Sequence, residues 1–181
     1  MTSSDWKIFE KSPEEREEEE MYRACRVAAV SYAAGRLRSS GQIRRKLEQE
    51  DFSDAVKERV LHEMAEEGYC KDREICRSLM RVRRGRKAES HLALQKRLER
   101  HLVPREIILE ELDAYPSDRI LAYEYLDSLT DELICAYYSA HGPEEKKKAA
   151  ARLVRKAAGR GFHYRPVLDW IREQGKYYED S

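Results

Sequence analysis

Residues 152–170, RLVRKAAGRGFHYRPVLDW, combine a basic helix-like run, a Gly-Arg-Gly break and an apolar run that contains a tryptophan. Leu153 and Ala157 are four residues apart and therefore lie on one face of a helix. Because glycine adopts positive φ without a Cβ clash, we expect Gly159 and Gly161 to stop the helix and reverse the chain before Phe162. The stretch predicts two helices joined by a tight turn.

The same spacing of apolar residues occurs twice more, at intervals of about 50 to 60 residues, which indicates a diverged internal repeat. The matching residues are Ile43, Leu47 and Phe52 in IRRKLEQEDF, and Leu94, Leu98 and Val103 in LQKRLERHLV. Nine residues after the last member of each set stand Leu61, Leu112 and Ile171. Val56 and Ile107 match at four residues after it, and the third copy is shifted to Val167.

Helix signals cover almost the whole chain, while no clean period-two alternation suggests a strand. Ser12 with Pro13 and Glu15, and Ser39 with Gln42, form capping-box starts. Ser53 caps a further helix, which Gly68 closes, so the first three helices are expected over about 13–36, 40–50 and 54–67. About nine helices are expected in the whole chain, and residues 128–130 could break one of the later helices in two.

The predicted fold is all-α, with three tandem three-helix repeats in an elongated, curved array. A single module of this size has little core, so neighbouring modules are expected to help stabilise it. The expected parts are an acidic N-terminal extension (1–21), repeat 1 (22–69), repeat 2 (70–115), repeat 3 (116–175) and a C-terminal tail (176–181).

The charges are sorted in blocks, although 35 basic residues balance 35 acidic ones. Residues 36–46, 81–105 and 146–165 are basic, and 106–132 are acidic. Any one block has an ordinary explanation as a solvated helix face, but three basic blocks would all favour a polyanion or an acidic partner. We call the repeated set of apolar positions described above the apolar register. We predict that arginines next to these positions contact the partner, with guanidinium groups free to bind phosphates or carboxylates. These are Arg44, Arg45, Arg83, Arg84, Arg97, Arg100, Arg155 and Arg160.

Signals of catalysis, cofactors or targeting are weak. The five histidines lack metal-ligand spacing, there is no P-loop, and Asp72 is placed to cap the helix that follows it. We therefore predict no enzyme activity, including ATPase and nuclease activity, and no metal or cofactor. The four cysteines show no CxxC spacing and are expected to be reduced, mostly packed thiols. No apolar run suits a signal peptide or a membrane span, so a cytoplasmic location is expected.

Several segments together resemble the RecX family of regulatory proteins, over roughly residues 22–175. They are SSGQIRRKLEQEDF, VLHEMAEEGYCKDREICRSLM, RRGRKAESHLALQKRLERHLVPREIILEEL and RKAAGRGF. Gly68, Tyr69 and Asp72 match the family's junction between repeats one and two, and residues 159–162 match the run that opens its last helix. The chain departs from the pattern at residues 74–76, where Arg-Phe-Ala is usual, and at residues 84–87, where a Gly-Trp-Gly-like turn is usual.

The resemblance implies a non-enzymatic regulator that lies in the groove of the RecA–DNA filament and restrains recombinase, ATPase and coprotease activity, with a place in recombination, DNA repair and the SOS response. It implies DNA contact mainly within that filament, with at most weak binding to free DNA. We expect a monomer that does not bind membranes. Two alternatives remain: a helix-turn-helix-like DNA-binding protein, because basic three-helix units can imitate that motif, and a helical protein-interaction scaffold.

Overall fold

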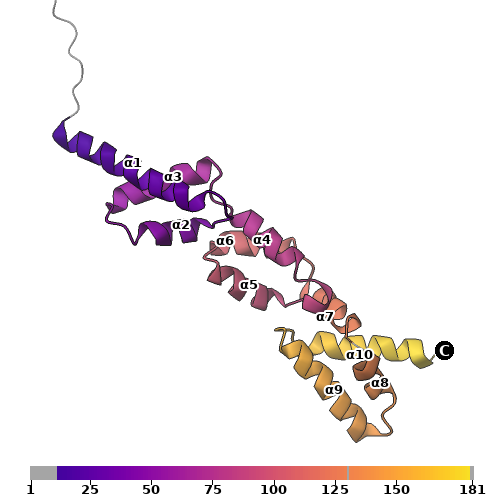
Figure 1. The fold of residues 1–181 in the computed structure, drawn as a ribbon. Helices are drawn as coiled ribbons and strands as arrows, with labels where there is room; N and C mark the ends of the chain where they lie inside the picture. Colours follow the sequence, from indigo (N-terminus) through magenta and orange to yellow (C-terminus); the bar gives the residue numbers. More distant parts are fainter. Residues whose placement is uncertain (1–11, 130, 180–181) are drawn as a thin grey trace, which may run out of the picture. The chain divides into compact units, whose positions relative to one another are not determined.

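The structure, a computed structural model, describes residues 12–129 and 131–179, and every regular element among them is helical (Figure 1). By their internal contacts these residues form two compact units, the first ending at Asp72 and the second beginning at Arg73. The all-α fold class is therefore confirmed. The elements are α1 (Pro13–Ala33), α2 (Ser40–Leu47), α3 (Asp54–Glu66), α4 (Asp72–Arg81), the 3₁₀ helix η1 (Gly85–Lys87), α5 (His91–Arg100), α6 (Arg105–Asp113), α7 (Asp118–Asp127), α8 (Asp131–Tyr138), α9 (Pro143–Ala158) and α10 (Tyr164–Glu179).

Serine side chains cap several helix starts, and the predicted capping boxes are confirmed. Ser12 Oγ accepts a hydrogen bond from the Glu15 amide at 3.1 Å, and the Ser12 amide donates to the Glu15 carboxylate at 2.7 Å. Ser39 and Gln42 make the same exchange at the start of α2. Each exchange satisfies two amides that a helix end leaves without a partner. Ser53 and Ser90 cap α3 and α5 through their hydroxyl groups alone. Each hydroxyl accepts a hydrogen bond from the backbone amide three residues later in the chain.

The core of the first unit lies between α1, α2 and α3, with α1 packed along α3 (Figure 1). Ile43 and Leu47 of α2 are fully buried, as the register predicts, and Phe52 packs against the same cluster partly buried. Helix α1 ends earlier than expected, because Ala34 already has extended backbone and Gly35 takes a φ of 81°.

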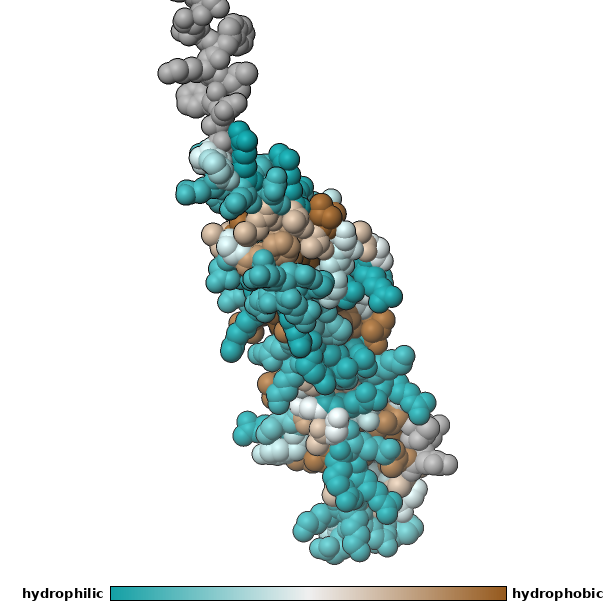
Figure 2. Space-filling view, turned by 60° about the vertical axis from the view of Figure 1, so that its left-hand side comes forward, coloured by the Kyte–Doolittle hydropathy of each residue, from teal (hydrophilic) through white to brown (hydrophobic). Residues whose placement is uncertain are grey.

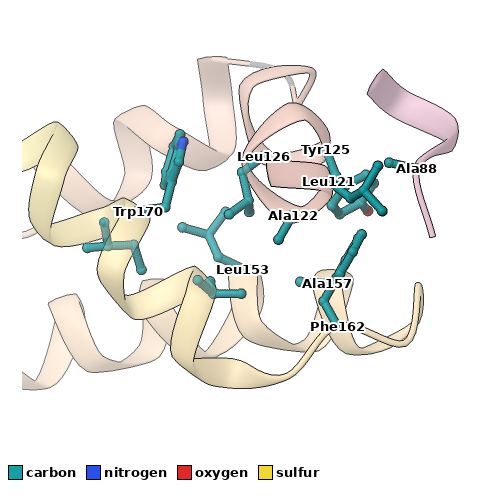
Figure 3. Close-up of a cluster of buried hydrophobic side chains, with 11 residues drawn as sticks. Ala88, Leu121, Ala122, Tyr125, Leu126, Leu153, Ala157, Phe162 and Trp170 are labelled. Carbon is teal, nitrogen blue, oxygen red and sulfur yellow. The ribbon is translucent and has the colours of Figure 1, made fainter. Parts of the chain in front are cut away.

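The second unit holds two clusters. In the first, Leu94 and Leu98 of α5 pack with residues of α4 and α6, including Cys76 and Ile108. In the second, Leu153 of α9 packs between α7 and α10, with Trp170 on one side and Phe162 beyond Ala157 on the other (Figure 3). Ala88, which follows η1, also joins this second cluster, so the segment after α4 is anchored in the core beside α7.

One apolar position of the predicted second repeat was assigned wrongly. Ile108 is fully buried and Ile107 only partly. Ile108 lies four residues before buried Leu112, as Val167 lies four before buried Ile171. In a helix of 3.6 residues per turn, residues four apart lie on one face, whereas Ile107 lies five residues before Leu112 and is turned away from that face. The prediction counted four residues from Val103, which precedes the helix, and so missed this spacing.

The helix expected at the start of the predicted third repeat is broken, as residues 128–130 suggested. Helix α7 ends at Asp127, Ser128 Oγ donates to the Tyr125 carbonyl oxygen at 2.6 Å, and α8 begins at Asp131. A serine hydroxyl bound to the backbone in this way competes with helix continuation. The described residues therefore contain ten α-helices, where the sequence indicates about nine.

An aspartate from the start of a later helix holds the first amide of α2 and of α5. The Ser40 amide donates to the carboxylate of Asp72 at 3.1 and 3.3 Å, and the His91 amide donates to Asp118 at 2.7 Å. Asp72 was expected to cap the helix that follows it, but its carboxylate binds the start of α2 instead. Because a carboxylate is favoured at a helix N-terminus, each aspartate stabilises the end of a helix remote in sequence.

The Gly-Arg-Gly turn has two glycines with different roles. Gly161 has a φ of 86°, and a Cβ there would overlap Ser90 Oγ. The Ser90 amide donates to the Arg160 carbonyl oxygen at 3.1 Å, so the turn lies against the start of α5. Gly159 has a φ of −62°, which any residue adopts, and the expectation that it supplies positive φ is wrong. At the position equivalent to Gly161 in the second module, Leu102 takes a φ of 55°.

Candidate partner-binding surface

Five of the predicted contact arginines lie on the middle helices α2, α5 and α9, Arg160 follows α9, and Arg83 and Arg84 lie between α4 and η1. Several of the eight are not free. Arg97 Nε and Nη2 donate to the carboxylate of Glu89 at 3.0 and 2.7 Å. Glu89 is only 5% exposed, and Arg83 Nη1 lies 3.6 Å from the same carboxylate. The hydrogen bond to Glu89 raises the pKa of Arg97. Arg97 is therefore the main partner of a buried charge, and the expectation that its guanidinium is free is wrong.

Two further arginines of the predicted set pair with carboxylates on neighbouring helices. Arg44 binds Glu58 through both guanidinium nitrogens of its fork, one of them at 3.0 Å. Arg84 Nε donates to Glu124 at 2.7 Å, and the Glu124 carboxylate also accepts from the Gly85 amide at 3.3 Å. These bonds hold the pKa of Glu124 below its ordinary value. Arg84 thus holds η1 against α7, so its role in this structure is to stabilise the fold.

The remaining predicted residues differ in how much of the guanidinium is available. Arg160 is partly buried over the Tyr125 ring, 5.6 Å from its centre, and donates to the Arg86 carbonyl oxygen at 3.4 Å. Arg155 is exposed, and only its Nε is bonded, to a carbonyl oxygen of its own helix at 3.3 Å. Arg45 and Arg100 are exposed, and neither has an ion pair within the described part of the chain.

Aligning the three middle helices on their buried residues reveals one shared cationic position. Two residues after Ile43, Leu94 and Leu153 stand Arg45, Lys96 and Arg155, and all three are exposed. None of the three is paired with a carboxylate among the side chains that the structure describes, those of residues 12–129 and 133–174. Lys96 is absent from the predicted set because that set was chosen among arginines, although the register itself contains it. The structure therefore brings out a position that carries an available cation once per module; we call these three residues the register cations.

The described residues contain no group of three or more histidine, cysteine or acidic side chains placed to hold a metal ion. Within the same residues, no helix combines the length and hydropathy that crossing a bilayer requires. The cysteines are free thiols: Cys25 and Cys76 are buried, Cys70 is partly buried and Cys135 is exposed. Burial raises the pKa of the Cys25 and Cys70 thiols, which makes both less reactive as thiolates.

A family model and a curated protein that are similar to this chain in sequence both carry the name RecX. Residues 25–64 match the family model described as RecX, first three-helix domain. The regulatory protein RecX of Trichlorobacter lovleyi is 30% identical over 94 residues, which are 52% of this chain and 61% of that protein. The aligned region thus spans less than two thirds of the relative's length.

Two solved structures share the fold. The crystal structure of RecX from Lactobacillus salivarius superimposes with a TM-score of 0.69 at 15% identity, covering 86% of this chain and 97% of the other. A second crystal structure, of a regulatory protein RecX, gives a TM-score of 0.64 at 12% identity, covering 91% and 79% of the two chains. At these identities the superpositions establish the fold alone.

Proposed function

The chain belongs to the RecX family, and we propose that it regulates RecA without catalysing a reaction, by binding along the RecA–DNA filament and restraining its recombinase, ATPase and coprotease activities. Family membership supports the partner. The observation that carries the proposed contact surface is the set of register cations, Arg45, Lys96 and Arg155. A filament presents the same chemical groups at regular intervals, and a chain with one available cation per module is suited to such a surface.

The chemistry of the three residues fits this partner. Each lies on an exposed helix face beside the buried register, so its charge can meet a phosphate or a carboxylate without disturbing the core. Exposed cations contribute mainly through long-range attraction, which steers association and weakens as salt rises. Arg97, Arg84 and Arg44 have a lesser place in this surface, because they would have to leave Glu89, Glu124 and Glu58 to bind a partner.

The test is a charge reversal at all three register cations, Arg45→Glu, Lys96→Glu and Arg155→Glu, in one variant. Its matched control reverses three exposed arginines that lie off the register and have no carboxylate partner among the described residues: Arg16, Arg105 and Arg165. The two variants carry the same net charge, so a difference between them reports position and not overall charge.

We expect the register variant to bind RecA filaments on single-stranded DNA at least about tenfold more weakly than the wild type, a loss of about 1.4 kcal/mol. It should also lose restraint of strand exchange, while the control keeps most of both. Equal behaviour of the two variants would remove the register cations from the contact surface. Wild-type binding to free duplex DNA as tight as binding to the filament would favour the helix-turn-helix-like alternative.

A further inference from the structure

An open groove of about 740 Å³ lies along α9 and α10 in the second unit. The alanine and valine side chains of α9 form its floor, with Tyr164 and Leu168 of α10. Its remaining lining residues are four cations of α9, Lys147, Lys148, Arg152 and Arg155, and no acidic side chain lines it. The groove is therefore apolar at the bottom and positive at the edge.

The cations of the groove have no carboxylate partner among the described residues. Of the acidic side chains nearest in sequence, Glu145 accepts from the His141 amide at 2.9 Å and Asp169 pairs with Arg172 at 3.3 Å, while Glu144 is exposed in the first turn of α9. All four cations are exposed. Four like charges along one helix repel one another, and a bound anionic group would relieve that repulsion.

The apolar floor is also left uncovered. Tyr164 is 47% exposed and Leu168 is 37% exposed, although the adjoining face of the same helix, with Val167 and Trp170, is buried. They stand four residues apart and so form one strip along α10. Figure 2 shows that hydrophilic side chains cover most of the face in view, and that hydrophobic side chains reach that face only in patches. An apolar strip beside unpaired cations is typical of a site for an amphipathic partner.

We propose that this groove binds an acidic, amphipathic segment of a partner protein, with its large apolar side chains on the floor and its carboxylates on the cationic edge. The floor is mainly aliphatic, with a single aromatic ring, so it suits leucine or phenylalanine side chains better than stacked nucleobases. Its volume lies within the range of pockets that bury several side-chain-sized groups. The site depends only on α9 and α10 and shares one residue, Arg155, with the register cations, so it does not rest on the identity of the filament partner proposed above.

The probe for the test is a fluorescein-labelled synthetic peptide of about fourteen residues, roughly four helical turns. It carries leucine and phenylalanine at helical spacing i, i+3, i+4 and i+7 and glutamate at most other positions. Fluorescence polarisation is measured with the full chain, and a peptide with lysine in place of every glutamate serves as the charge control. We expect the acidic peptide to bind, more weakly as salt rises, and the lysine peptide not to bind.

The variant Leu168→Asp places a carboxylate on the floor, and its matched control Leu109→Asp changes a leucine that is 48% exposed on α6. We expect Leu168→Asp to weaken peptide binding at least about tenfold and Leu109→Asp to leave it unchanged. Lys148→Glu should weaken binding, and its control Lys87→Glu should not. Melting curves of all four variants show whether each remains folded.

Several outcomes would overturn the proposal. They are equal binding of the acidic and lysine peptides, or acidic-peptide binding that is insensitive to Leu168→Asp in a folded variant. Tighter, Leu168-dependent binding of oligo(dT), or of a peptide with the sequence of residues 1–11, would assign the groove to a different occupant. Filament binding by Leu168→Asp is measured in parallel, so failure of this proposal and failure of the filament proposal are separate results.

Discussion

Replacing Gly161 by alanine should destabilise the second unit strongly, for reasons local to one turn. Gly161 has positive φ, and an added Cβ would overlap Ser90 Oγ and lie 3.1 Å from Ala93 Cβ. Ser90 is fully buried and cannot move freely, because its hydroxyl accepts from the Ala93 amide and its amide donates to Arg160. The methyl group would therefore strain the backbone and displace the cap of α5 together.

The magnitude follows from three contributions. Left-handed backbone costs an alanine about 1 kcal/mol, a lost serine cap about 1 kcal/mol, and a methyl forced into packed surroundings about 1–3 kcal/mol. The expected total is about 3–5 kcal/mol, which lowers the melting temperature of a chain of this size by about 6–20 °C. Gly159→Ala is the control two residues away. Its Cβ would meet only helix carbonyl oxygens, at 3.4 and 3.7 Å, so a change of at most about 1 kcal/mol, in the stabilising direction, is expected.

The assay is thermal and urea unfolding followed by circular dichroism and by tryptophan fluorescence. In a Trp6→Phe background, Trp170 alone reports, and it is buried in the cluster that the turn completes. A large gap between Gly161→Ala and Gly159→Ala is expected with both probes. If the two variants unfold alike, the close approach of the turn to Ser90 does not exist, and the account of this turn fails.

Three further predictions concern buried charges. Arg97→Glu should lower the free energy of unfolding by about 2–4 kcal/mol, because it leaves buried Glu89 facing a second carboxylate. The control Arg100→Glu should change the free energy of unfolding by less than about 0.5 kcal/mol. Urea unfolding of both variants measures the difference, and equal midpoints would contradict the prediction. Asp72→Ala should cost about 1–3 kcal/mol by leaving the Ser40 amide without its acceptor, whereas Asp72→Asn keeps an acceptor and avoids burying a charge, so it should melt close to the wild type. The arginines bonded to Glu111 lower its pKa below the ordinary 4.5, so its contribution is complete above that pH and is lost as the pH falls through the lowered value. Glu111→Gln should therefore reduce the loss of melting temperature on acidification from pH 5 to pH 3, and an unchanged pH profile would count against the ion pair.

The helices and most of their inward faces could be predicted from the sequence because both depend on nearby residues. Ser12 and Ser39 bind amides three residues away, and the pairs Ile43/Leu47 and Leu94/Leu98 are adjacent on a helix surface whatever lies opposite. The error at Ile107 arose because the position was counted from Val103, which lies before the helix, and not from Leu112 within it. Residues four apart share a helix face, so the spacing to Leu112 indicates Ile108 as the buried isoleucine.

The candidate surface was less predictable, because ion pairs depend on where distant segments meet. A cation beside the apolar register looks the same in the sequence whether it is available, like Arg45, or bound, like Arg84, whose partner Glu124 lies on another helix. The burial of Glu111 could not be predicted from the sequence either. Glu111 occupies an inward position of α6 because Arg73 and Arg77 supply the hydrogen bonds that a buried carboxylate needs.

The sequence by itself determined that this protein is helical, where most of its helices start and end, and that a turn falls before Phe162. Those features follow from capping, helical period and the conformational freedom of glycine, all of which act within a few residues. Only the tertiary structure decided that position 161 has no room for a side chain, since Ser90 occupies that space, and that Arg97 holds a buried carboxylate while Lys96 beside it is exposed. Both depend on contacts that exist only after the modules have packed, because steric room and charge pairing are properties of the neighbours in space.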